Sequence, residues 1–143
     1  MTRFLRQPDS FSCGPVALLN LDKWRGIKVT HEDLPHYKRL CCAHIEYGTF
    51  KSQMTKIIGK RGRRLSYEQF ASHKGAAIIN CRYRDGKGGH YFLVIGRCKG
   101  IHDNRRIWRY GWMAVNFSNT VDVLSPDEMR SILKRSRVWT FGK

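Results

Sequence analysis

The stretch RQPDSFSCGPVALLNLDKW, residues 6–24, contains the strongest local structural signals in the chain. Apolar residues at helical spacing follow Cys13, Pro15 lies in the first turn, and Gly26 stands just past the end. The pattern predicts a helix over residues 13–24 with Cys13 at its N-terminus. Two interpretations of Cys13 follow: a nucleophile, or a small buried apolar residue at the top of a core helix, the commoner role of a lone cysteine.

The composition is that of a globular protein. A chain of 143 residues is long enough for one domain with its own core, and we treat residues 1–143 as a single domain. The longest apolar runs, AAII and YFLVIG, are much shorter than the roughly 20 residues of a membrane span, and no apolar signal segment follows the N-terminal arginines. Five cysteines without paired spacing argue against a disulfide framework. We therefore expect a cytoplasmic protein with no membrane contact.

The order of the predicted elements defines the fold class. The segment GTFKSQMTKIIGKRG predicts a helix capped by Thr49, and Ser66 precedes one further helical turn. After Gly75, the runs AAIINCRY and HYFLVIGRC predict a hairpin, and IWRYGWMAVNFS predicts a third strand. Ser125 is expected to cap the helix PDEMRSILKRS, and VWTF forms a last strand. Helices followed by an antiparallel sheet indicate an α+β protein.

Four residues form a candidate catalytic set. A thiol at a helix N-terminus beside an imidazolium has a lowered pKa, and Cys13 meets the first condition. Gln7, six residues upstream, is spaced to offer its amide to an oxyanion, with the N–H of Cys13 as the second donor. His90 opens a strand after GKGG and is the candidate base. Asn116 is the candidate that orients the imidazole, and three further residues could take that role instead: Asn80, Asp103 and Asp122.

These residues resemble the papain-like cysteine peptidases, and most of all the bacterial double-glycine peptidases that trim bacteriocin precursors. The order Gln, Cys, His, then Asn or Asp is similar, as are the segments SCGP, GGHYFLVIG and WMAVNFSN. The GT at positions 48 and 49, opening a helix that ends in GKRG, also looks like that branch. The resemblance runs from Gln7 to about Phe117. It implies a papain-like fold, with the nucleophile at a helix N-terminus packed on the sheet.

The resemblance also implies roles for the four residues. Cys13 would be the nucleophile, His90 the general base and acid, Asn116 the orienting residue and Gln7 the oxyanion donor. The expected reaction is hydrolysis of a peptide or isopeptide bond in a peptide or protein substrate, through a thioester on Cys13. Amide exchange uses the same groups and remains an alternative. The sequence departs from the double-glycine branch at Asn116, which Phe117 follows, where those peptidases usually have Asp and then Pro.

The chain is strongly basic, with 27 Lys and Arg against 11 Asp and Glu and a net charge of +16. The electrostatic field of such a positive charge attracts polyanions. Aromatic residues such as Tyr110 and Trp112 interleave with arginines, as in a stacking platform for single strands, or belong to the sheet core. The alternative function is therefore a catalytically silent or incidental papain-like domain that binds nucleic acid or an acidic protein through basic residues, among them Lys60, Arg61, Arg63, Arg64, Arg105 and Arg106.

The segment CCAH raises the possibility of a metal site, because Cys41, Cys42 and His44 lie close together in the sequence. Adjacent cysteines seldom both reach one tetrahedral ion, and ligand pairs are usually two to four residues apart. The further candidate ligands are distant in the chain: Cys81, Cys98 and His102. We therefore predict neither a metal nor a cofactor.

Overall fold

The computed structural model describes residues 3–43, 48–82, 89–102, 107–115 and 120–142. Its helices come first and its sheet second, apart from one late helix. The helical part comprises α1 (Cys13–Trp24), a 3₁₀ turn (His31–Asp33), α2 (Leu34–Leu40), α3 (Lys51–Ile58) and α4 (Tyr67–Ser72). The second part comprises β1 (Ala77–Arg82), β2 (Gly89–His102), β3 (Ile107–Val115), β4 (Val121–Leu124), α5 (Pro126–Leu133) and β5 (Ser136–Thr140).

The five strands form one antiparallel sheet in the order β4-β3-β2-β1-β5. The predicted hairpin is confirmed as β1 and β2, with Ile78 opposite Leu93. The last strand, β5, pairs antiparallel with β1 along the edge of β1 that faces away from β2. Strand β4 was missed in the sequence, because this short edge strand has no buried alternate positions that would produce a period of two.

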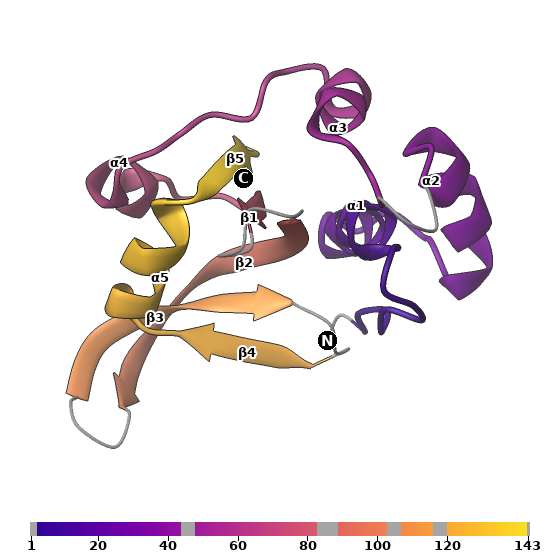
Figure 1. The fold of residues 1–143 in the computed structure, drawn as a ribbon. Coiled ribbons are helices and arrows are strands. Elements are labelled where there is room, and N and C mark those ends of the chain that lie inside the picture. The colour runs from indigo at the N-terminus through magenta and orange to yellow at the C-terminus, as the bar shows by residue number, and fades with distance from the viewer. Residues whose placement is uncertain (1–2, 44–47, 83–88, 103–106, 116–119, 143) are drawn as a thin grey trace.

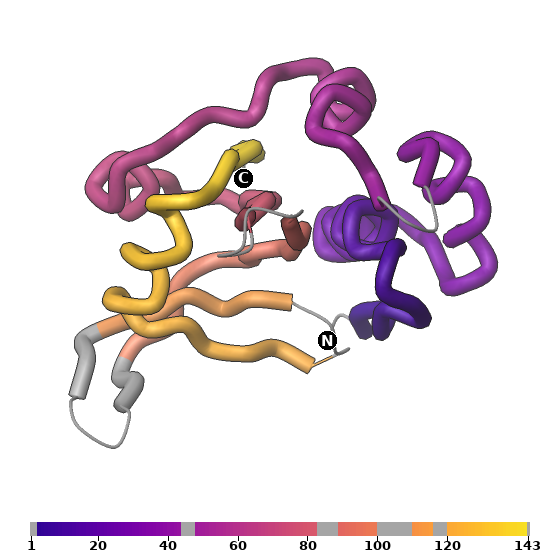
Figure 2. Tube along the Cα trace, viewed as in Figure 1, coloured from indigo at the N-terminus to yellow at the C-terminus, as the bar shows by residue number. Residues whose placement is uncertain are grey.

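Helices cover both faces of the sheet (Figures 1 and 2). Successive side chains of β2 point to opposite faces, so Leu93 joins the cluster under α1, and Phe92 joins the cluster under α4 and α5. Figure 1 shows α1 beside the sheet, α2 and α3 outside α1, and α4 and α5 at the opposite side. None of the described helices is long and apolar enough to cross a bilayer.

Local capping was predicted correctly at two helices and incorrectly at one. The hydroxyls of Ser66 and Ser125 accept hydrogen bonds from the backbone at the third position of α4 and α5, each within a capping box. The N-cap of α3 is Phe50, which makes no side-chain cap, so the prediction for Thr49 was wrong. Thr49 is buried instead, because it packs against Gly14 at the start of α1.

Tyr110 and Trp112 of β3 belong to the core of the sheet and do not form a stacking platform. Trp112 is 2% exposed, and its ring meets the rings of Tyr110 and Tyr67 edge to face at 5.3 and 5.5 Å. The two tyrosine hydroxyls are hydrogen-bonded to each other at 3.0 Å. Of the two interpretations of this aromatic pattern, the structure supports the sheet core.

Candidate active site

Cys13 is the first residue of α1 and is 8% exposed. Burial raises the pKa of its thiol. The N–H groups of Tyr91, Gly14 and Cys13 itself face the sulfur and act in the opposite direction, and the charge of Asp9 adds to the rise. The net pKa is above its ordinary value, so the expected lowering by the helix N-terminus was wrong for the free protein. The reason is that desolvation of the buried thiolate outweighs the helix dipole and its N–H donors.

His90 is the second residue of β2, and its side chain is 8% exposed. Its ring stacks on Phe92 with the ring centroids 6.3 Å apart and an interplanar angle of 17°. The N–H that faces the Cys13 sulfur belongs to Tyr91, so the thiol lies against the peptide group that joins His90 to Tyr91. The fold therefore brings the candidate nucleophile to the strand that carries the candidate base. The stacked His90 ring, however, shares its side of β2 with Phe92, whereas Cys13 packs with Tyr91 on the side under α1.

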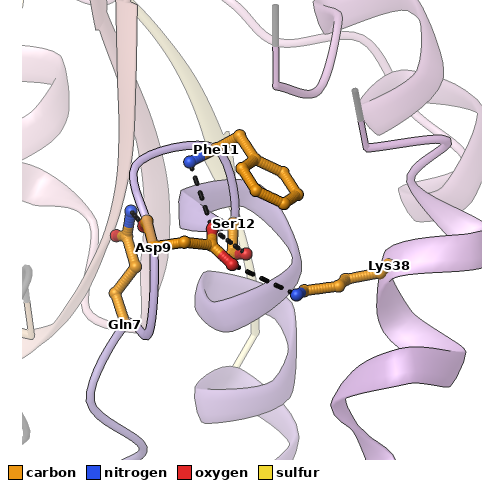
Figure 3. A network of polar contacts seen from close by, with 5 residues as sticks. All are labelled: Gln7, Asp9, Phe11, Ser12 and Lys38. Carbon is orange, nitrogen blue, oxygen red and sulfur yellow. Dashed lines mark hydrogen bonds and ion pairs between the residues drawn. The ribbon is translucent and has the colours of Figure 1, made fainter. Parts of the chain in front are cut away.

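Gln7 lies in the loop before α1, within a polar network centred on Asp9 (Figure 3). Its Nε2 donates a hydrogen bond to the backbone carbonyl of Asp9. The Asp9 carboxylate accepts hydrogen bonds from the hydroxyl of Ser12 and from the N–H of Phe11 at 3.2 Å, and it pairs with the ammonium of Lys38 at 3.2 Å. The Gln7 amide is thus held by the loop in the free protein.

The electrostatics of Asp9 follow from these contacts. Partial burial would raise the pKa of the carboxyl, but the hydrogen bonds from Ser12, Lys38 and Phe11, together with the charge of Lys38, hold the pKa below its ordinary value. The carboxylate is therefore ionised at neutral pH. Because Ser12 donates to Asp9, it leaves α1 without a side-chain cap, and N–H groups of the first turn stay available beside Cys13.

Asp9 and Lys38 were not singled out in the sequence. The contact from Asp9 to the N–H of Phe11 is a turn that Asp forms with the backbone two residues on, and PDSF carries that signal. The link to Lys38 on α2 joins residues far apart in the chain, so no local pattern predicts it. This ion pair ties the loop before Cys13 to the neighbouring helix.

The buried thiol of Cys41 and the buried hydroxyl of Tyr91 lie close to Cys13. Burial raises the pKa of the Tyr91 phenol, and the nearby Cys13 and Cys41 raise it further. Its hydroxyl is buried and has no hydrogen-bond partner among the described residues. Cys41 is 1% exposed, and burial raises the pKa of its thiol to about 12. Cys41 is therefore an unreactive core thiol, in line with its surroundings.

Asn116, the predicted orienting residue, lies outside the described residues, as does Asp103. Asn80 is half-buried on β1, directly opposite Tyr91 in the strand register. Asp122 is exposed on β4, which β3 separates from β2. Among the described candidates for this role, Asn80 is therefore the one on a strand adjacent to His90.

The two adjacent cysteines of the possible metal site have different surroundings. Cys41 is buried and Cys42 is exposed, so the two side chains do not share one environment, and His44 lies outside the described residues. In the part of the chain that the structure describes, no three His, Cys, Asp or Glu side chains are grouped to hold a metal ion.

The described basic residues among those singled out in the sequence have different surroundings. Lys60 donates to the backbone carbonyl of Thr140 and lies 5.2 Å from the centre of the Phe141 ring. Arg63 pairs through its backbone with Val138 of β5, while Arg64 lines a pocket at the start of that strand. Arg61 is exposed. Arg105 and Arg106 lie outside the described residues.

No protein-family model matches the sequence, and no curated protein sequence matches it. Solved structures do match. The peptidase domain of Streptococcus ComA, a bi-functional ABC transporter involved in a quorum-sensing pathway, aligns over 100% of both chains with a TM-score of 0.66 and 15% identity. A double-glycine motif protease from an AMS/PCAT transporter, solved in complex with the leader peptide, aligns over 94% of this chain and 87% of its own with a TM-score of 0.65 and 11% identity. The chain therefore has the papain-like α+β fold of double-glycine peptidase domains, which confirms the predicted fold.

Proposed function

We propose that the protein is a cysteine peptidase that hydrolyses a peptide or isopeptide bond through a thioester on Cys13. One observation carries the proposal: the Cys13 thiol, at the uncapped N-terminus of α1, faces the Tyr91 N–H on the strand that begins with Gly89 and His90. The fold, shared with solved peptidase domains, supports this assignment.

The chemistry follows from the protonation state of the thiol. Because burial keeps Cys13 neutral in the free protein, His90 accepts the thiol proton as the sulfur attacks the carbonyl carbon. The imidazolium then gives that proton to the leaving amine as the C–N bond breaks, which leaves a thioester. His90 next removes a proton from water, which attacks the thioester, releases the carboxylic acid and returns the thiol.

Gln7 and Asn116 have supporting roles in this reaction. The N–H of Cys13 and the side-chain amide of Gln7 would stabilise the oxyanion, for which the Gln7 amide must turn away from the Asp9 carbonyl. Asn116 would orient the imidazole, with Asn80 as the alternative.

The test is cleavage of a proteome-derived peptide library, read by mass spectrometry of the new termini. We expect cleavage to vanish in Cys13→Ala with unchanged thermal unfolding, and to fall by about one to three decades in Gln7→Ala. Cys42→Ala, which removes an exposed thiol, is the matched control and should cleave normally. Cleavage by Cys13→Ala at the native rate would refute the mechanism. Adding hydroxylamine tests for the acyl enzyme, because hydroxylamine captures a thioester as a hydroxamate whether the reaction ends in hydrolysis or in amide exchange.

The alternative is a basic binding protein, and the net charge of +16 is the observation that favours it. Binding of nucleic acid through that charge would survive Cys13→Ala and weaken steeply as salt increases. Salt-dependent binding without any thiol-dependent cleavage would select this function over the peptidase.

A further inference from the structure

A pocket of about 150 Å³ opens where the end of β1, the start of β5, the end of α5 and the start of α3 meet. Its lining is dominated by cationic side chains: Lys51, Arg64, Arg82, Lys134, Arg135 and Arg137. They come from four separate segments of the chain, so only the folded protein assembles them.

The charge of this pocket is not neutralised within the part of the chain that the structure describes. The carboxylates of the ion pairs found there belong to Asp9 and Asp127, and neither lines the pocket. Burial, together with the charges of Arg82, Arg137 and Arg64, lowers the pKa of Lys51. Like charges held this close repel one another, and a bound anion would offset that repulsion.

The pocket adjoins the proposed catalytic histidine. Cys81 on β1 pairs with His90 on one side and with Ser136, a lining residue, on the other. The side chain of Asn80, also in the lining, lies 3.3 Å from where a Cβ on Gly89 would stand. Since neighbouring strands are about 4.8 Å apart, the pocket lies within about 10 Å of the His90 backbone. An extended peptide covers that distance in about three residues.

The lining selects the kind of anion. The described residues that form it include no aromatic ring on which a base would stack, so the pocket lacks one of the features by which proteins bind single-stranded nucleic acid. Its volume suits a single acidic side chain, and guanidinium groups bind carboxylates in a planar, paired geometry. We infer that this pocket binds an acidic side chain of the peptide substrate, within about three residues of the scissile bond. This specificity rests on the proposed peptidase function.

Binding is tested first, without catalysis, in the Cys13→Ala protein at fixed salt. The probes are fluorescein-labelled octaglutamate, octaglutamine and an eight-nucleotide oligothymidylate, read by anisotropy. We expect octaglutamate to bind more tightly than octaglutamine, and Arg82→Gln/Arg137→Gln to lose at least about tenfold in octaglutamate affinity. Arg3→Gln/Arg39→Gln removes the same charge from exposed positions outside the pocket and should lose much less.

Three results would overturn the inference. The protein could bind octaglutamate and octaglutamine with equal affinity, or the two double variants could lose equal affinity for octaglutamate. The third is a pocket variant that loses affinity for oligothymidylate but keeps its affinity for octaglutamate. Thermal unfolding checks the pocket variant, which should be at least as stable as the native protein because two charges that repel Lys51 are gone. A pocket variant that is unfolded is replaced by Lys134→Gln/Arg64→Gln, with the same expectations.

Cleavage of the peptide library then tests the link to catalysis. We expect Asp and Glu to be enriched within about three residues of the cleaved bond for the native protein, and the enrichment to disappear for Arg82→Gln/Arg137→Gln. Thiol-dependent cleavage without acidic enrichment would refute the inference and leave the peptidase intact. Absence of thiol-dependent cleavage would refute the peptidase, while the binding measurements would still decide whether the pocket accepts acidic peptides.

Discussion

Replacing Gly14 by Ala should destabilise the protein, although alanine normally favours a helix. A Cβ at this position would lie 2.8 Å from Thr49 Oγ1, 3.0 Å from Thr49 Cβ and 3.3 Å from Met54 Cε. Favourable carbon contacts begin near 3.5 Å, so α1 and the buried Thr49 must separate by several tenths of an ångström. Because the closest contact is only 2.8 Å, we expect a cost of about 2 to 3 kcal/mol, in the upper part of the usual range for overpacking. The helix propensity of alanine returns up to about 1 kcal/mol, which leaves a net loss of about 1 to 2 kcal/mol.

The assay is urea unfolding of a double-mutant cycle that combines Gly14→Ala with Thr49→Ala. Removing the Thr49 hydroxyl and methyl groups clears the closest contact, so Gly14→Ala should cost about 1 kcal/mol less in the Thr49→Ala background. Because Gly14 follows Cys13, the same displacement should also slow cleavage by the native thiol. A neutral or stabilising Gly14→Ala, or strict additivity with Thr49→Ala, would refute the packing argument.

Four further predictions follow from the electrostatics and the caps. In the free protein, the rate at which iodoacetamide labels Cys13 should rise at a higher pH than the rate for a free cysteine in solution, since burial raises the pKa of the thiol; fast labelling at pH 6 would contradict this. Asp9→Asn should lower the pKa of Cys13 and shift that labelling profile to lower pH, because the carboxylate charge opposes thiolate formation. The pKa of Asp9 is lower in the folded state than in the unfolded state. The native protein should therefore have a larger free energy of unfolding than Asp9→Asn at neutral pH, and this difference should disappear as the pH falls below about 4, measured by urea unfolding across pH. Ser125→Ala should cost about 1 kcal/mol in the same assay, with Ser72→Ala, which does not cap a helix, as the control.

Local signals predicted most of the elements. The start of α1 at Cys13 and the caps at Ser66 and Ser125 depend on residues within one helical turn of each other, and each was found where the sequence placed it. The hairpin of β1 and β2 was predicted for the same reason, from two apolar runs close in the chain. Strand β4 and the position of Thr49 were not, because the first has little buried surface and the second is decided by contact with Gly14.

The candidate site was predicted only in part. The residue types and their order suggested Cys13, His90 and Gln7, but the contacts that set their state come from distant segments. Burial against β2 raises the pKa of Cys13, and the Asp9 loop holds the Gln7 amide. Asn116 remains a prediction.

The sequence by itself determined the class of the protein: an α+β chain, strongly basic, with a cysteine at a helix start and a histidine at a strand start. These properties depend on composition and on neighbours within a few residues. Only the tertiary structure decided that the thiol rests neutral and that cations from four segments surround one pocket near His90. The physical reason is that desolvation and charge repulsion depend on which distant segments the sheet brings together, and no local pattern encodes that pairing.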